Sequence, residues 1–295
     1  IEGKETALNL AGGKLTVHFD NDTHPELDLS VATLSGFKSE VGTHTITVEY
    51  QGLQTQFDIT VSPKAITHIA IAAMPTKVMY RQGVERFDPK GGKITVYYNN
   101  DKQEELALST ATVSGFSNLF AGDVTLTATY GGKKVQFKGL ILAENPFADV
   151  KVIDYFEIPV LWAVTLGLTN GTDAPHFSPT ANCTRGQIVT FLWRAAGEPE
   201  PQSANNPFTD VKSNQYYYKA VLWAVENGIT NGMGNNQFKP DDTCTRGQVV
   251  TLLHRAKGKP AASGTIAFTD VKKGEYYYEA VLWAVQNGIT TGMSA

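Results

Sequence analysis

The chain has 295 residues, enough for two or three compact domains, and a net charge of −4. Its 42% hydrophobic and 18% charged residues are typical of folded protein and exclude a disordered chain or a collagen-like rod. Lysine and arginine do not cluster, and the most apolar run outside the helical repeats, residues 69–74, is far shorter than the roughly 20 residues of a membrane span, so we expect neither a nucleic-acid partner nor membrane insertion.

The N-terminal half contains one strand-rich pattern twice, over residues 1–62 and 63–143. Residues 12–17 read like residues 91–96, and both copies contain a Ser-Gly-Phe segment. Apolar residues alternate with polar ones, as in a half-buried strand, and Asn, Asp and Gly mark the turns. The pattern resembles bacterial immunoglobulin-like domains, which predicts two β-sandwiches. The second copy opens with a strand that has no counterpart in the first, so we expect the first copy to lack its opening strand.

The C-terminal half contains a different motif three times, over residues 144–205, 206–264 and 265–295. Each copy has an aromatic-x-Asp-Val entry, an apolar helix around a tryptophan and a Gly-x-x-x-Gly turn. The first two copies continue into a Phe-x-Pro loop and a Thr-Arg helix start. Helices that are apolar on nearly every face are buried inside a bundle. We therefore predict an all-β tandem followed by a mainly α-helical repeat region.

The helical stretch resembles tandem S-layer homology motifs, which implies a secreted bacterial protein at the cell surface or cell wall. The resemblance also implies a pseudo-threefold bundle that binds secondary cell-wall polysaccharide, in many bacteria a pyruvylated one, in grooves between adjacent motifs. Gly-Gln follows the motif arginine where Ala-Glu is usual, which could indicate a different polymer. The third copy stops before its Phe-x-Pro loop, so we expect it to be completed elsewhere or to expose an apolar face that favours self-association.

The two Thr-Arg helix starts combine a capping box with an arginine that capping does not explain. A cation in the first turn opposes the helix dipole, so Arg185 and Arg246 need another partner. The resemblance supplies a pyruvyl carboxylate, which a guanidinium holds through two parallel hydrogen bonds. The alternative is an ion pair with a nearby Asp or Glu. The capping residues are Thr184, Gln187, Thr245 and Gln248.

Two further sets of residues are candidates for polysaccharide contact and also have structural interpretations. The tryptophans either stack an indole on a sugar ring or pack in the core. The aspartates of the entry segments either brace the turn before the tryptophan helix or, as the resemblance implies, lie near the ligand groove. The candidates are Trp162, Trp223, Trp283, Asp149, Asp210 and Asp270.

The chain's only cysteines, Cys183 and Cys244, occupy the same position in two copies of the motif. Equivalent positions in neighbouring repeats are usually a whole repeat apart, whereas a disulfide needs Cα atoms within roughly 7 Å. We therefore interpret both cysteines as small, buried apolar residues rather than as a disulfide pair. Their spacing does not fit a zinc knuckle either, and we expect no metal or cofactor.

Enzyme signatures such as His-Glu-x-x-His, Gly-x-Ser-x-Gly or a phosphate-binding glycine loop are absent from the sequence. We therefore predict a non-catalytic wall-anchoring module with the immunoglobulin-like pair as a spacer. One alternative is the accessory C-terminal region of a large secreted peptidase or glycosidase whose catalytic domain lies outside these residues. A third possibility is an adhesin, for which no exposed aromatic cluster marks a binding face.

Overall fold

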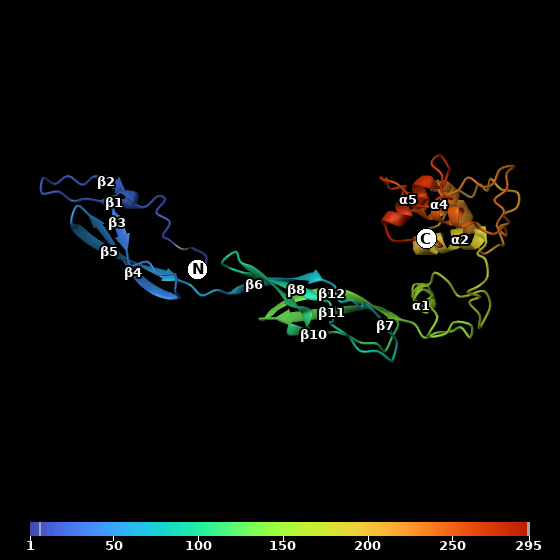
Figure 1. The fold of residues 1–295 in the computed structure, drawn as a ribbon, viewed down its shortest axis with the longest axis horizontal. Helices are drawn as coiled ribbons and strands as arrows, with labels where there is room; N and C mark the ends of the chain where they lie inside the picture. Colours follow the sequence, from blue (N-terminus) through green and yellow to red (C-terminus); the bar gives the residue numbers. More distant parts are fainter. Residues whose placement is uncertain (6, 294–295) are drawn as a thin grey trace. The chain divides into compact units, whose positions relative to one another are not determined.

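The computed structural model describes residues 1–5 and 7–293, and the chain divides into two compact units, Ile1–Ile141 and Leu142–Ala295. Strands make up the first unit and helices joined by long loops the second, as the blue-to-green and yellow-to-red parts of Figure 1 show. This order confirms the predicted all-β region followed by a helical region. Within the described residues, no helix is both long and apolar enough to span a lipid bilayer.

The second half of unit 1 is a sandwich of two sheets. Buried side chains from both sheets meet between them, among them Ile94, Leu126 and Phe137. One sheet has the order β6-β8-β9, with β6 at Ile66–Ala73, β8 at Lys93–Tyr98 and β9 at Gln103–Ala107. The other has the order β10-β11-β12-β7, with β10 at Thr112–Ser114, β11 at Gly122–Tyr130, β12 at Lys133–Leu142 and β7 at Met79–Arg81.

The first half of unit 1 repeats this arrangement with fewer strands. In the described residues, nothing before β1 corresponds to β6 or β7. Phe57 is 40% exposed, whereas its counterpart Phe137 is 7% exposed, because β6 and β7 add Ile69 and Tyr80 to the second core. The strands are β1 at Lys14–Thr16, paired with β2 at Glu26–Asp28, and a second sheet of β3 at Thr33–Ser35, β4 at Gly42–Tyr50 and β5 at Leu53–Val61.

The Ser-Gly-Phe segment has a backbone reason to recur in both copies. Gly36 and Gly115 have φ angles of +92° and +88°. A Cβ atom at these positions would lie 2.3 and 2.6 Å from the carbonyl oxygens of Thr45 and Thr125. Only glycine combines this conformation with so close an approach, so the segment is a structural turn into the next strand.

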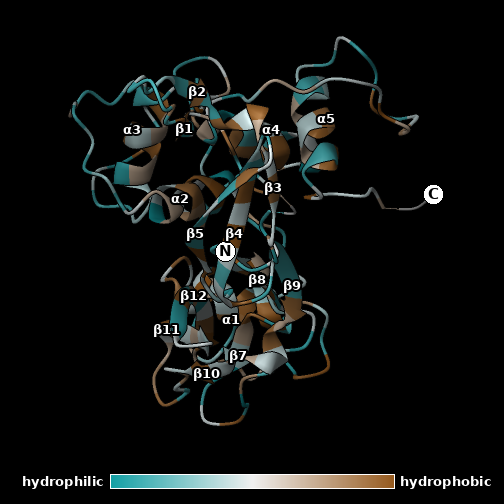
Figure 2. Cartoon of the chain, turned by 90° about the vertical axis from the view of Figure 1, so that its left-hand side faces the viewer, coloured by the Kyte–Doolittle hydropathy of each residue, from teal (hydrophilic) through white to brown (hydrophobic). Residues whose placement is uncertain are grey.

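The described part of unit 2 contains five α-helices, in which tryptophan helices alternate with Thr-Arg helices. Helix α2 packs on α3, α4 packs on α5, and α2 also contacts α4. The largest core of this unit includes Val189, Val221 and Leu252. Helix α5 shows brown turns beside teal ones in Figure 2, since its apolar stretch is flanked by polar residues. The helices are α1 at Glu157–Thr165, α2 at Arg185–Ala195, α3 at Tyr218–Glu226, α4 at Arg246–Ala256 and α5 at Tyr278–Gln286.

A short antiparallel bridge joins the first two repeats beside the two cysteines, which we expected to lie a whole repeat apart. Thr184 lies opposite Thr243, and the amide of Cys244 donates to the carbonyl of Cys183 over 3.0 Å. Both cysteines are free thiols. The premise that they lie a whole repeat apart is wrong, because the loop that ends at Cys244 folds back onto the helix start that follows Cys183.

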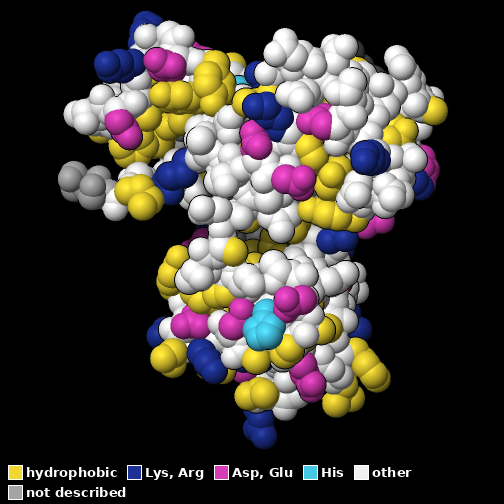
Figure 3. Space-filling model, turned by 90° about the vertical axis from the view of Figure 1, so that its right-hand side faces the viewer, with side chains coloured by type: hydrophobic (Ala, Val, Ile, Leu, Met, Phe, Trp, Pro, Cys, Tyr) yellow, Lys and Arg dark blue, Asp and Glu magenta, His cyan; other side chains and the backbone are white. Residues whose placement is uncertain are grey.

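The third repeat exposes an isoleucine that the second repeat buries. Ile289 is 46% exposed, whereas its counterpart Ile229 is 1% exposed. Met293 and Tyr276 of the same repeat are 82% and 60% exposed, and their counterparts Met233 and Tyr216 are also exposed, at 45% and 58%. Figure 3 shows yellow hydrophobic side chains gathered over this part of unit 2, at the upper left of the view.

Candidate functional site

Arg185, the first residue of α2, inserts into the Phe-x-Pro loop of the next repeat. Its Nε donates to the carbonyl of Phe238 over 2.9 Å, and its guanidinium carbon lies 4.8 Å from the centre of the Phe238 ring. The side chain is only 4% exposed, and this burial lowers the pKa of the guanidinium. Within the described residues, Arg185 therefore contacts a backbone carbonyl and an aromatic face, and it does not form the ion pair with an Asp or Glu that was the alternative.

Arg246, the first residue of α4, has the same place in the motif but is exposed. One Nη nitrogen donates to the hydroxyl of Thr290 over 3.2 Å, and the other lies 3.1 Å from the sulfur of Met293. Both partners are neutral and belong to the third repeat. In the part of the chain that the structure describes, no carboxylate forms an ion pair with Arg246.

Both helix starts contain the expected capping box. The hydroxyls of Thr184 and Thr245 accept from the amides of Gln187 and Gln248, and each glutamine side chain accepts from the threonine amide. The next repeat then satisfies two more amides of α2: Arg185 donates to the carbonyl of Asp242, and the following glycine donates to that of Pro240. The helix N-terminus is thus fixed both locally and by the neighbouring repeat.

Close packing explains why glycine follows the arginine. A Cβ atom at Gly186 would lie 3.0 Å from the ring of Tyr217 and 3.2 Å from the carbonyl oxygen of Pro240. At Gly247 it would meet only the ring of Tyr277, at 3.1 Å. The glycine therefore permits the close contact between a helix start and the next repeat. The sequence alone did not predict this contact.

The entry-segment aspartates brace the Phe-x-Pro loop, and not the turn before the tryptophan helix that we expected. The Asp149 carboxylate accepts from the amides of Phe177 and Ser178 over 2.9 and 2.8 Å. The hydrogen bond from Phe177, followed by that from Ser178, holds the pKa of this carboxyl below its usual value. In the second repeat, Asp210 accepts from the amides of Phe238 and Lys239 over 2.9 and 2.7 Å. Asp270 is exposed in the third repeat.

Two of the three tryptophans are buried, as core packing requires, and the third has an exposed surface on which a sugar could stack. Trp223 and Trp283 are 9% and 8% exposed, because α2 packs on α3 and α4 packs on α5. Trp283 also lies 5.3 Å from the ring of His254. These two indoles are core residues, whereas Trp162 on α1 is 40% exposed and leaves part of its ring open.

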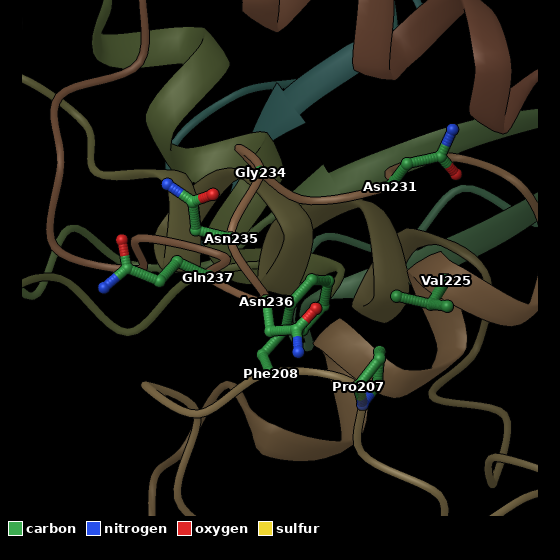
Figure 4. A pocket seen from close by; sticks show the side chains of 8 residues that line it. All are labelled: Pro207, Phe208, Val225, Asn231, Gly234, Asn235, Asn236 and Gln237. Carbon is green, nitrogen blue, oxygen red and sulfur yellow. The ribbon is translucent and has the colours of Figure 1, made fainter.

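Each of the first two repeats also has a shallow pocket, whose lining residues were not among the candidates predicted from the sequence. In the second repeat it measures about 330 Å³ and lies between the entry segment and the loop after the Gly turn (Figure 4). Amide side chains of Asn231, Asn235, Asn236 and Gln237 line it. The corresponding pocket of the first repeat measures about 240 Å³ and has a single lining amide, Asn170. The polar character of the pocket therefore differs between the repeats.

Family models match both halves of the chain. The model of the S-layer homology domain matches residues 146–189, 207–250 and 267–295. The chain carries S-layer homology repeats. The model of the bacterial Ig-like domain (group 3) matches residues 5–61 and 75–138, in front of these repeats. Neither model is that of a catalytic domain. The chain is thus a cell-surface anchoring module with Ig-like domains.

Proteins similar to parts of this chain include enzymes and a surface-layer protein. An endoglucanase of Bacillus sp. (strain KSM-635) is 35% identical over 111 residues, 38% of this chain. An amylopullulanase of Thermoanaerobacterium thermosulfurigenes is 25% identical over 252 residues, 82% of this chain. The surface-layer 125 kDa protein of Lysinibacillus sphaericus is 29% identical over 146 residues, 49% of this chain. The chain spans 12% of the length of each. The predicted location at the bacterial cell surface or cell wall is confirmed, and the matches add a surface layer as a possible setting of this kind.

Proposed function

We propose that the S-layer homology repeats hold a larger protein non-covalently to secondary cell-wall polysaccharide, with the Ig-like pair as a spacer. The observation that carries this proposal is Arg246. Its guanidinium is exposed at the junction of the second and third repeats, and its hydrogen-bond partners among residues 1–5 and 7–293 are the neutral side chains of Thr290 and Met293. An exposed guanidinium of this kind is able to bind the carboxylate of a pyruvylated sugar through two parallel hydrogen bonds.

The other candidates have supporting roles in this proposal. Arg185 is buried against Phe238, so it positions the Phe-x-Pro loop and does not itself touch the polymer. Asp149 and Asp210 hold the loops of the first two repeats in shape. Trp162 is the tryptophan with enough exposed surface to stack on a sugar ring.

Calorimetric titration of the 295-residue chain with purified polysaccharide tests the proposal. We expect Arg246→Ala to weaken binding by roughly 10-fold or more, because a charge-assisted bidentate contact is lost. Removing the pyruvyl groups from the polymer should weaken binding of the unaltered chain to a similar extent. Arg86→Ala, which removes an exposed arginine of the second Ig-like domain, should leave affinity unchanged.

The possible outcomes separate the site from the function. If Arg246→Ala binds normally and keeps its circular dichroism spectrum, the role of Arg246 is wrong while the anchoring function stands. If the unaltered, folded chain binds neither form of the polymer, the anchoring function itself is wrong.

A second proposal concerns the larger protein. We propose that these residues are the wall-binding part of a secreted polysaccharide hydrolase, because the endoglucanase and the amylopullulanase are among the relatives and the chain spans 12% of each. An immunoblot of wall extracts with an antibody against the repeats, run beside a polysaccharide zymogram, tests this. A single large band that carries both signals supports the proposal, and an antibody band without hydrolytic activity contradicts it.

We further propose that the exposed face of the third repeat mediates self-association. Ile289, Met293 and Tyr276 give this face its apolar surface. Light scattering during size-exclusion chromatography should show a dimer that Ile289→Glu converts to a monomer. A monomer at all concentrations contradicts this proposal.

A further inference from the structure

The two cysteines face one another across the bridge that joins the first two repeats. Two hydrogen bonds flank the opposed pair Thr184 and Thr243: one from the amide of Cys244 to the carbonyl of Cys183, and one from the amide of Arg185 to the carbonyl of Asp242. Each is 3.0 Å long. This is the pattern of a non-hydrogen-bonded antiparallel pair.

The register of the bridge fixes which residues come next. One step beyond Thr184 and Thr243, the antiparallel register sets Cys183 opposite Cys244, and the amide of Cys244 donates to the carbonyl of Cys183, which is one of the two bonds of a hydrogen-bonded pair. Opposed residues of such a pair have Cα atoms about 5.5 Å apart, with side chains on the same face. Disulfides span Cα separations of about 4.4 to 6.8 Å. The register therefore gives the two cysteines a backbone separation that a disulfide accepts.

The surroundings of the thiols permit oxidation. Cys183 is exposed and Cys244 is half-buried, so an oxidant in solution reaches at least the first of them. Partial burial raises the pKa of both thiols, so the reactive thiolate is scarce at neutral pH and more abundant in mildly alkaline solution. A protein on the cell surface is also outside the reducing cytosol that keeps thiols free.

We propose that Cys183 and Cys244 close an intramolecular disulfide when a low-molecular-weight disulfide is present. The Cys183 thiolate attacks the sulfur–sulfur bond of the oxidant, forms a mixed disulfide and releases one thiolate. The Cys244 thiolate then attacks the Cys183 sulfur and releases the second. The cysteines lose two protons and two electrons, and the oxidant is reduced to two thiols.

The disulfide fastens the first repeat junction and leaves the second without a covalent link. It fixes the Phe-x-Pro loop of the second repeat on the helix start that carries Arg185, where the Phe238 contact is made. The second junction has no equivalent, because the chain contains only these two cysteines. Oxidation therefore holds the first two repeats in register.

Oxidised glutathione at pH 8, added to the full 295-residue chain, tests the proposal. We expect both thiols to be lost together, with a mass decrease of about 2 Da for one new S–S bond and a cross-linked peptide pair that contains residues 183 and 244. Closing a loop of this length should raise the midpoint of thermal unfolding by roughly 5 to 10 °C, and dithiothreitol should reverse the change.

Cys183→Ser and Cys244→Ser serve as matched controls, since each removes one sulfur and leaves the other in place. Neither should show the oxidant-dependent rise in melting temperature. Thiols that stay titratable, that carry only separate glutathione adducts, or that link two chains on a non-reducing gel would overturn the proposal. Because these outcomes are read by mass and by gel, they do not depend on the stability of the variants.

Discussion

The first and second repeat junctions contain the same Thr-Arg-Gly-Gln segment, yet their arginines lie in different surroundings. Arg185 is 4% exposed and bonded to the carbonyl of Phe238, whereas Arg246 is exposed and contacts Thr290 and Met293. The capping geometry is the same at both. The motif therefore places the arginine at the first position of a capped helix. The packing of the following repeat determines whether its guanidinium is exposed to a ligand.

The largest expected effect follows from removing the aromatic ring that covers Arg185. Phe238 is fully buried, so Phe238→Ala should lower the free energy of unfolding by about 3 to 5 kcal/mol through lost burial and a cavity. Phe177→Ala, at the same position of the first repeat, should have a smaller effect because Phe177 is only partly buried. Urea titration followed by tryptophan fluorescence measures both. Equal losses would contradict the claimed difference between the two loops.

The arginines themselves should differ in their contribution to stability. Arg185→Ala should cost about 2 to 3 kcal/mol, because it removes a buried hydrogen bond from a charged group and its contact with the ring. Arg246→Ala should cost less than about 1 kcal/mol, because the side chain is exposed. Arg185→Lys should not restore stability, since an ammonium lacks the planar donor at Nε. Urea unfolding of all three variants checks this order, and a larger loss for Arg246→Ala would reverse the comparison.

Alanine substitution of Gly186 and Gly247 tests whether the first repeat junction is packed more tightly than the second. Alanine favours a helix by up to about 1 kcal/mol over glycine. At Gly186 the added methyl group meets the rigid carbonyl of Pro240 and the ring of Tyr217, so Gly186→Ala should destabilise by about 1 kcal/mol. At Gly247 it meets only the ring of Tyr277, so Gly247→Ala should lie within about 0.5 kcal/mol of the unaltered chain. Thermal unfolding distinguishes the two, and similar shifts would mean that the carbonyl does not restrict the site.

The smallest expected effect is the pH dependence contributed by Asp149. Hydrogen bonds from the amides of Phe177 and Ser178 place its folded-state pKa below the unfolded value. Its stabilising contribution is therefore fully present above the unfolded pKa, near 4, and is lost as the pH falls through the folded pKa. Asp149→Asn should flatten the decline in melting temperature below pH 4, whereas the exposed control Asp20→Asn should not. Parallel pH profiles for the two variants would contradict this role.

Several features followed directly from local sequence patterns. The alternation of apolar residues predicted the long paired strands, such as β11 with β12. The Thr-x-x-Gln spacing predicted both capping boxes, because all their partners lie within one helical turn. The repeated motifs also gave the order of the two kinds of domain.

Contacts outside regular helices and strands could not be predicted in the same way. The Asp149 carboxylate bonds amides 28 and 29 residues further on, so its role in the loop has no local sequence signal. In the second repeat, His254 occupies the position that Trp193 has in the first. Each ring donates a hydrogen bond to a proline carbonyl over 2.9 Å, from Trp193 Nε1 to Pro199 and from His254 Nε2 to Pro260.

The sequence by itself determined the domain order, the strand and helix positions and the capped helix starts, because periodicity and capping act over a few neighbouring residues. Only the tertiary structure decided that Arg185 is covered while Arg246 is open, and that Cys183 lies opposite Cys244. These outcomes depend on how one repeat folds back onto the previous one. The arginine contacts are made with residues 53 positions further on for Arg185 and 44 and 47 positions further on for Arg246. The same motif therefore has a buried arginine at one junction and an exposed arginine at the other.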